Sequence, residues 1–354
     1  MRNIWILIVT ITLLLICCEK ESYFQIEKIG ETIELPGLHI ESYTYSAEKV
    51  KVSDVCFINE SIGYIFGSDG MMKRTSHPKS IWTPMESGVH TSITTASFIN
   101  SSVGFASGEL MAGVGGNFNN SANLLKTING GKNWTLEFIP EIARIWDFYY
   151  FNKNDGIAYL MAMLNGGETH IAKTNDGGSN WILLDLPIPE FRYLGPESTE
   201  RIFVKEDICY IIADENLIYK SADFGNSWDT INPPTEIWRA CFISKTTGFI
   251  TDRDNISLTE DGGENWIELP DLPYSISAFH FFDRMNGYGL HHRYAYVGGD
   301  FPEMVSTILI STTDGGQSWS EKEVDMIIRG KKSFPTENLG YLIHYNEMFI
   351  FNRK

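Results

Sequence analysis

Five octamers along the chain place a hydroxyl group, a carboxylate or carboxamide, a glycine and a tryptophan at a fixed spacing. They read TINGGKNW, TNDGGSNW, SADFGNSW, TEDGGENW and TTDGGQSW. Their acidic or amide residues and closing tryptophans are Asn129 and Trp134, Asp176 and Trp181, Asp223 and Trp228, Asp261 and Trp266, and Asp314 and Trp319. Carboxylates can act as general acids or bases, but an active site needs such a group once, whereas this one recurs. The spacing predicts a structural turn, in which the carboxylate accepts backbone N–H groups, glycine takes a positive φ and tryptophan buries its ring under the turn.

A second polar position stands three residues before a recurrent strand aromatic. The aromatic residues are Phe57, Phe98, Tyr150, Phe203, Phe242, Phe281 and Phe334, and the residues three positions earlier are Asp54, Thr95, Asp147, Glu200, Arg239, Ala278 and Lys331. Trp146 and Trp238 precede two of them. Carboxylates, cations and indole rings of this kind can hydrogen-bond to and stack on a polar ligand such as a glycan or a peptide. The alternative is that these charges pair with one another.

The elements that position both sets of residues repeat along the chain. TSHPKSIW at 75–82 keeps the Thr-to-Trp spacing of a sixth, degenerate octamer. Between octamers, an aromatic-rich strand, a turn and a second apolar strand recur seven times, as in CFINESIGYIFG and SFINSSVGFASG. Short strands rich in β-branched and aromatic residues, repeated about every 40 to 50 residues, predict an all-β fold. The expected architecture is a seven-bladed β-propeller with four-stranded blades.

The last unit lacks a fourth strand, because the chain stops at MFIFNRK. Near the other end, TIELPGL at 32–38 matches WIELPDL at 266–272, with Thr in place of Trp. We therefore predict that the N-terminal strand at 32–38 completes the last blade. This would close the ring and remove exposed strand edges. The propeller is expected to span 32–354.

One face of such a propeller is expected to carry the binding site. Loops from fourth to first strands and from second to third strands share this face, where the central channel opens. We predict ligand binding at the channel mouth by Asp54, Trp146, Asp147, Glu200, Trp238, Arg239 and Lys331. Long loops at 107–125, 183–200 and 291–307 add the rim residues Phe191, Arg192, His291, Arg293 and Tyr294. The alternative is that these loops are insertions without a ligand. Side chains of adjacent histidines diverge on a strand, so no metal site is predicted, and no cofactor.

The octamers resemble the Asp-box, or BNR repeat, of sialidases, of some cellulose- and xyloglucan-cleaving enzymes and of sortilin-type receptors. The longer unit, with its FxN-type strand and GYxxG pairing, is most similar to the photosystem II assembly factor family and its bacterial relatives. This resemblance covers nearly all of the chain after the N-terminal segment and implies a seven-bladed propeller. It also implies a binding or assembly role, although members of this fold do different things.

An enzyme is the alternative function, and it would be a glycoside hydrolase of sialidase-like or glucan-cleaving type. Such an enzyme would use paired carboxylates at the channel mouth. The sialidase resemblance implies an FRIP motif before the first octamer, whereas FRYL at 191–194 lies mid-ring and lacks the Ile-Pro pair. The xyloglucan enzymes set their acid and base between two propellers, and this chain encodes one. We therefore predict a binding protein without covalent chemistry.

The N-terminal segment MRNIWILIVTITLLLICCEK predicts a bacterial lipoprotein signal over residues 1–17. Its apolar run at 4–16 suits a signal-peptide core and is short for a membrane span. Cys18 is the favoured lipidation site because Cys17 supplies the small residue before it, whereas Cys17 as acceptor would have bulky Ile16 there. A plain secretory signal or an uncleaved anchor is the alternative. Residues 18–31 would form a tether, and the lack of Asp next to Cys18 favours the outer membrane.

Composition limits the partners. The formal net charge is −17, and an acidic surface repels phosphate backbones, which excludes nucleic acid as the expected ligand. Cys56, Cys209 and Cys241 each lie in an apolar strand and are expected to be buried rather than paired in disulfides. The prediction is a monomeric, lipid-anchored envelope propeller that binds a protein, peptide or glycan.

Overall fold

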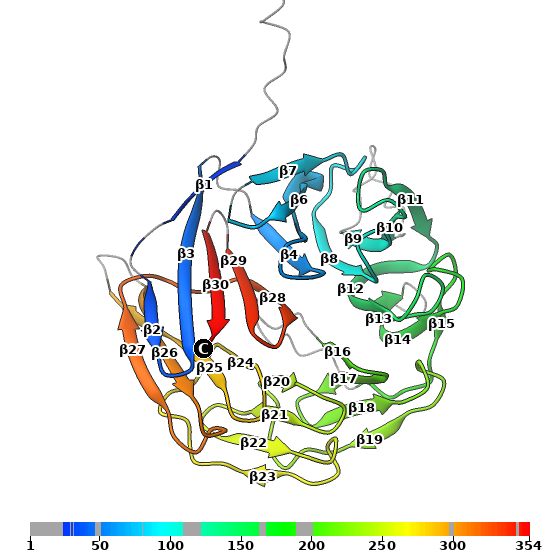
Figure 1. Ribbon diagram of the computed structural model, residues 1–354. Helices are drawn as coiled ribbons and strands as arrows, with labels where there is room; N and C mark the ends of the chain where they lie inside the picture. Colours follow the sequence, from blue (N-terminus) through cyan, green and yellow to red (C-terminus); the bar gives the residue numbers. More distant parts are fainter. Residues whose placement is uncertain are drawn as a thin grey trace, which may run out of the picture.

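The computed structural model describes residues 24–28, 30, 32–46, 51–79, 81–108, 122–162, 168–188, 201–296, 301–344 and 347–354. These residues form seven antiparallel blades arranged in a ring (Figure 1). The predicted all-β, seven-bladed propeller is therefore confirmed. One short 3-10 turn, η1 (Ser68–Gly70), interrupts the strands. No helix within the described ranges is long and apolar enough to cross a membrane.

Each blade is a meander whose first strand lines the channel. Blade 1 contains β4 (Val52–Phe57), β5 (Gly63–Gly67), β6 (Met72–His77) and β7 (Ile81–Met85). Blade 2 contains β8 (Ile93–Phe98), β9 (Gly104–Gly108), β10 (Ala122–Thr127) and β11 (Thr135–Ile139). Blade 3 contains β12 (Ile142–Tyr150), β13 (Gly156–Ala162), β14 (Thr169–Thr174) and β15 (Ile182–Leu183). Blade 4 contains β16 (Ile202–Lys205), β17 (Ile208–Asp214), β18 (Leu217–Ser221) and β19 (Asp229–Ile231). Blade 5 contains β20 (Arg239–Phe242), β21 (Gly248–Thr251), β22 (Ile256–Thr259) and β23 (Ile267–Glu268). Blade 6 contains β24 (Ala278–Phe281), β25 (Gly287–Ala295), β26 (Glu303–Thr312) and β27 (Ser320–Val324).

Blade 7 is closed by an N-terminal strand, as predicted, but the predicted stretch was wrong. β28 (Lys331–Thr336), β29 (Leu339–His344) and β30 (Glu347–Arg353) are followed outward by β3 (Leu38–Ser46). Residues 32–38 instead supply β2 (Ile33–Leu35), which pairs only with β3. The reason is the Pro36–Gly37 turn, where Gly37 takes a φ of 69° and reverses the chain, so that the longer β3 reaches β30.

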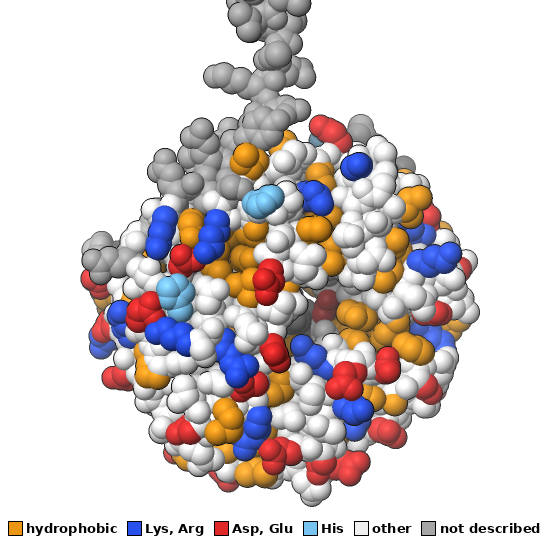
Figure 2. All heavy atoms as spheres, viewed as in Figure 1, with side chains coloured by type: hydrophobic (Ala, Val, Ile, Leu, Met, Phe, Trp, Pro, Cys, Tyr) orange, Lys and Arg blue, Asp and Glu red, His pale blue; other side chains and the backbone are white. Residues whose placement is uncertain are grey.

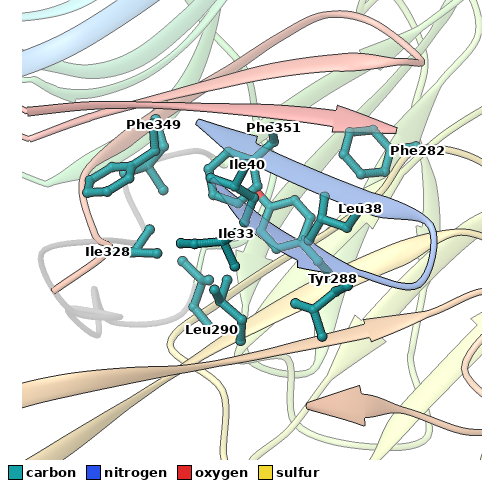
Figure 3. Close-up of a cluster of buried hydrophobic side chains, with 12 residues drawn as sticks. Ile33, Leu38, Ile40, Phe282, Tyr288, Leu290, Ile328, Phe349 and Phe351 are labelled. Atoms are coloured by element: carbon teal, nitrogen blue, oxygen red, sulfur yellow. The ribbon is translucent and has the colours of Figure 1, made fainter. Parts of the chain in front are cut away.

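The closing hairpin is held by apolar packing. Ile33, Leu38 and Ile40 of this hairpin lie against Tyr288 and Leu290 of blade 6, with strand β30 on the other side (Figure 3). Ile40 is completely buried. The Oγ of Ser311 also donates a hydrogen bond to the carbonyl of Pro36 at 2.9 Å. Closure therefore buries apolar surface between blades 6 and 7 as well as pairing the edge of β30.

An additional strand joins the outer edges of the first and last blades. β1 (Phe24–Lys28) pairs with β3 through four residues and with β7 through Phe24 and Gln25. Blades 7 and 1 thus form one continuous ten-stranded sheet. β1 falls inside the 18–31 range expected to be a tether, so the folded body begins earlier than the sequence suggested.

Stacked rings couple neighbouring blades and explain the glycine near the start of the second strand in every blade except blade 4. Phe281 of β24 stacks on Phe249 of the preceding blade at 3.5 Å between ring centroids. The same ring lies over its own second strand, where a Cβ added to Gly287 would be 2.8 Å from it. Equivalent ring pairs are Phe57 with Tyr341, Phe98 with Tyr64, Tyr150 with Phe105, and Phe242 with Tyr210. Glycine at this position allows the ring to sit between two blades.

Candidate functional site at the channel mouth

The first strands of all seven blades enclose a channel of about 340 Å³. Figure 2 shows a hollow at the centre of the ring, where this channel opens. We call the face on which first strands begin and second strands end the mouth face. Five of the seven predicted mouth residues lie in strands of the channel wall: Asp54, Trp146, Asp147, Arg239 and Lys331. Trp238 precedes β20, and its ring is covered by the guanidinium of Arg253 at 4.8 Å. Glu200 lies outside the described residues.

The mouth carboxylates connect consecutive blades. One oxygen of Asp54 accepts the N–H of Ala96 in blade 2 at 2.7 Å, and the other accepts the N–H of Val55 at 2.8 Å. Asp147 accepts the N–H groups of Arg201 and Ile202, at the start of blade 4, at 2.8 and 3.0 Å. These bonds satisfy backbone donors on the inner edge of each blade, where no further strand is available as a partner. Both carboxylates therefore have a structural role in linking consecutive blades.

Arg239 spans blades in the same manner. Its Nε donates to the carbonyl of Ser277 in blade 6 at 2.7 Å, and its Nη1 donates to the carbonyl of Trp238 at 2.7 Å. The guanidinium thus ties the start of blade 5 to the start of blade 6. Its charge still contributes to the potential at the mouth.

In several blades a second layer of links lies one residue before the first-strand aromatic. The Oγ of Ser333 accepts the N–H of Phe57 at 2.9 Å, and the Sγ of Cys241 lies 3.5 Å from Nδ1 of His280. Burial, with added repulsion from Lys332 and Lys205, lowers the pKa of His280 well below its ordinary value, so the ring is neutral at neutral pH. Burial raises the pKa of the Cys56 thiol to about 12. All three described cysteines are free, and Cys209 and Cys241 are buried as predicted, whereas Cys56 is only partly buried because its strand lines the channel.

Cations outnumber carboxylates along the described channel wall. The charged lining residues are Lys205, Arg239, Arg329, Lys331 and Lys332 against Asp54 and Asp147. This contrasts with a chain whose formal net charge is −17. A channel with low-dielectric walls concentrates the potential of its lining charges. The channel therefore favours an anionic group although the molecule as a whole is acidic.

Arg329 has an incompletely satisfied guanidinium beside this wall. Its Nη1 contacts the Sδ of Met304 at 3.6 Å, and its Nε is buried without an acceptor among the described residues. Arg329 also helps to depress the pKa of His344 to about 4, although burial is the larger cause. The charge of Arg329 also favours the ionised form of the nearby Glu347, whereas its buried Nε could still donate to a further acceptor.

Arg329 and Lys332 were not among the residues predicted from the sequence. Both belong to the basic run RGKKS that begins at Arg329, and that run was the available signal. Only Lys331 of this run occupies the position three residues before an aromatic. The spacing from the strand aromatic therefore identified only one of the three cations of this run that line the channel.

The predicted rim residues divide between two regions. Phe191 and Arg192 lie outside the described residues. His291, Arg293 and Tyr294 all belong to β25, where Nδ1 of His291 donates a hydrogen bond to the carbonyl of Ser275 at 2.8 Å. The guanidinium of Arg293 pairs with both oxygens of Glu323 at 3.0 and 2.9 Å. These residues form the stem of a hairpin at the side of the mouth face rather than part of the channel wall.

The five octamers have the predicted turn chemistry. In each, the Ser or Thr hydroxyl donates to the Asp or Asn side chain and accepts a glycine N–H, at 2.7–3.1 Å and 2.8–2.9 Å respectively. The carboxylate or amide oxygen also accepts the N–H of the residue before the tryptophan, as between Asp176 and Asn180 at 2.9 Å. In two octamers the tryptophan Nε1 donates back to a glycine carbonyl. These side chains are occupied by their own turns.

Comparison with known proteins supports the fold. No family model and no curated protein matches the sequence. The structure is similar to YCF48 bound to a D1 peptide, with a TM-score of 0.61 and 14% identity over 91% of this chain and 99% of that one. YCF48 from Cyanidioschyzon merolae gives the same TM-score and identity, with coverage of 93% and 99%. The GH74 enzyme of Niastella koreensis has a TM-score of 0.57 and 15% identity, and this chain, covered over 85%, spans about half of it (52%). These similarities establish a β-propeller like YCF48.

Proposed function

We propose that this protein is a non-catalytic binding scaffold that holds an acidic protein or peptide segment at the channel mouth. The single observation that carries this proposal is the cationic channel wall within an acidic molecule. The structural similarity to a YCF48 that binds a D1 peptide supports a protein ligand over a glycan. The octamers, which we assign to the Asp-box type, serve as scaffold.

The hydrolase alternative is less well supported by the mouth. Among the described channel residues, the two carboxylates both accept backbone N–H bonds from the next blade. A general acid or nucleophile has to be available to the scissile bond. The GH74 similarity therefore supports the shared fold rather than the reaction.

The test is binding of immobilised peptides with acidic C-terminal segments, compared with amidated, charge-neutral versions of the same sequences. Replacing Arg329 and Lys332 by alanine is expected to weaken binding by about tenfold or more, because two charge-assisted contacts are lost. The affinity should also fall as salt is raised. Lys322→Ala with Lys132→Ala, on the outer strand of blade 6 and in an octamer turn, is the matched control and should bind normally.

Equal capture of acidic and neutral peptides, unchanged by the Arg329 and Lys332 substitutions, would contradict the proposal that the channel is the binding site. Capture of glycans in preference to peptides on an array would favour the carbohydrate ligand. Release of reducing sugar from such glycans would favour the hydrolase.

We further propose that the protein is a lipoprotein of a bacterial envelope, acylated at Cys18 and held at the outer membrane as a monomer. The support is the sequence of the signal segment, since Cys17 and Cys18 lie outside the described residues. Metabolic labelling with palmitate should mark the wild-type chain and fail to mark Cys18→Ser. Labelling of Cys18→Ser but not Cys17→Ser would move the anchor to Cys17.

A further inference from the structure

A belt of hydrogen-bonding side chains lines the channel below the mouth residues. It consists of the residues that directly precede the strand aromatics in six blades: Cys56, Ser97, Tyr149, Cys241, His280 and Ser333. Tyr149 follows Asp147 by two strand residues, which places the belt about 7 Å deeper than the mouth carboxylates. Each belt residue carries an O–H, an S–H or an imidazole group, and none is a carboxylate. The belt is therefore a polar ring inside the channel.

Three hydroxyl groups of the belt have a proton to donate. The Oγ of Ser333 accepts the N–H of Phe57 at 2.9 Å, and the Oγ of Ser97 accepts the N–H of Tyr150 at 3.4 Å. A hydroxyl that accepts one hydrogen bond can still donate another. The hydroxyl of Tyr149 has no hydrogen-bond partner among the described residues. Burial raises the pKa of Tyr149, so this hydroxyl remains protonated and is a donor at neutral pH.

Two lysines converge on the belt from opposite sides of the ring (Figure 1). Lys205 is the last residue of β16 in blade 4, Lys332 lies in β28 of blade 7, and both line the channel. Burial is the largest cause that lowers the pKa of His280, and the ammonium groups of Lys332 and Lys205 lower it further. Both charges therefore lie near the belt. Lys205 is half-buried and pairs with no carboxylate in the described part of the chain.

The carboxylates nearest to the belt have other partners. Asp54 and Asp147 lie at the mouth, and both accept backbone N–H groups from the next blade. Glu206 and Asp207 lie in an exposed turn after β16 and are not among the described residues that line the channel. Glu206 pairs with Lys245 at 3.4 Å. The belt therefore combines hydrogen-bond donors with two positive charges, without a carboxylate at its own level.

We propose that this belt, with Lys205 and Lys332, binds one small free oxyanion such as inorganic phosphate or sulfate. A tetrahedral oxyanion accepts several hydrogen bonds at once, and ammonium and hydroxyl groups are suitable donors to it. The channel of about 340 Å³ has room for such an ion. An acidic side chain of a peptide would supply the same chemistry, but it is shorter than the depth of the belt below the mouth. The inference does not rest on the proposed peptide binding, because Lys205 and Tyr149 take no part in it.

The test is isothermal titration calorimetry of the full chain, purified in detergent, with inorganic phosphate and with sulfate at low ionic strength. We expect saturable binding of one ion per chain. Lys205→Met should weaken the binding about tenfold, because it removes one charge-assisted contact and keeps the packing of the side-chain stem. Lys322→Met is the matched control, since it removes the same charge from the exposed outer strand β27, and it should bind like the unmutated chain.

A companion variant, Tyr149→Phe, removes only a hydroxyl and should weaken binding several-fold with an unchanged circular dichroism spectrum. Absence of saturable binding, or equal affinity in Lys205→Met and the unmutated chain, would overturn the inference. Binding that is lost in Arg329→Ala but kept in Lys205→Met would also overturn it and would place the ion at the mouth. Phosphate binding that depends on Lys205 in a chain that captures no acidic peptide would support the belt site and refute the proposed function alone.

Discussion

At the scale of single residues, the polar side chains that repeat along the chain satisfy backbone groups. The octamer carboxylates close their own turns, and Asp54 and Asp147 supply acceptors to the first strand of the next blade. A buried or half-buried N–H without a partner costs free energy, so these acceptors recur wherever the strand ladder cannot supply one. The residues that we propose for ligand binding are the cations of the last blade, which do not repeat.

Asp176→Ala should lower the free energy of unfolding by about 1–2 kcal/mol, because the hydroxyl of Thr174 and the N–H of Asn180 lose their acceptor. Asp176→Asn is the matched control, since Asn129 fills the same position in another octamer and accepts the N–H of Asn133 at 3.0 Å. Urea unfolding followed by tryptophan fluorescence measures both. Equal losses for the two variants would show that the turn needs the charge.

The octamer carboxylates should make stability depend on acid pH. A hydrogen bond from the Ser227 side chain is the largest cause that lowers the pKa of Asp223 from 3.8 to about 2, and the N–H of Asn265 is the largest for Asp261, also to about 2. Because the folded pKa is depressed, this stabilisation is fully present above pH about 4 and is lost as pH falls from about 4 toward 2. Melting temperatures measured from pH 6 to pH 2.5 should show the decline, and it should be shallower in Asp223→Asn.

At the scale of elements, the pairing of the first two strands of a blade depends on one aromatic ring in the first strand and one glycine in the second. The exception is blade 4, where Cys209 stands at the position of the glycine. There the hairpin register shifts, so that Phe203 lies opposite Tyr210, whereas Phe57 lies opposite Gly63. A side chain at this position prevents the ring from lying across the second strand, and the hairpin adapts by one residue.

Gly248→Ala should destabilise the protein by about 1–3 kcal/mol, because the added Cβ would be 2.5 Å from the ring of Phe242. Phe242→Leu removes the obstructing ring and has its own cost. If the steric account is right, the double variant should lose less stability than the sum of the two single variants. Additive losses in equilibrium unfolding would mean that the glycine is needed for another reason.

At the scale of the whole molecule, the ring is closed by β3 and reinforced by β1, which joins the outer edges of the first and last blades. The C-terminal Lys354 lies beside the turn of the closing hairpin, where its N–H donates to the carbonyl of Gly37 at 3.2 Å. The two ends of blade 7 are therefore adjacent in space although they are far apart in sequence.

A circular permutant that begins at Lys51, runs to Lys354 and continues through a short Gly-Gly linker into 38–46 should fold as a monomer. It makes blade 7 continuous and keeps the pairing of β3 with β30. Size-exclusion chromatography and circular dichroism measure the outcome. The matched control omits 38–46, leaves the edge of β30 unpaired and should aggregate. A soluble, monomeric control would show that β3 is dispensable for closure.

The sequence by itself determined the blade number, the strand class and the turn chemistry, because the periods of aromatic, glycine and octamer residues reflect local geometry that each unit meets alone. The tertiary structure decided what is non-local. β3 rather than 32–38 closes the ring because the Pro36–Gly37 turn folds one segment back on the other. The polar ring at the mouth proved to contain links between blades, since Ala96 lies 42 residues from Asp54 and only the assembled ring brings them together. The cationic wall likewise comes from blades that adjoin the channel only after closure.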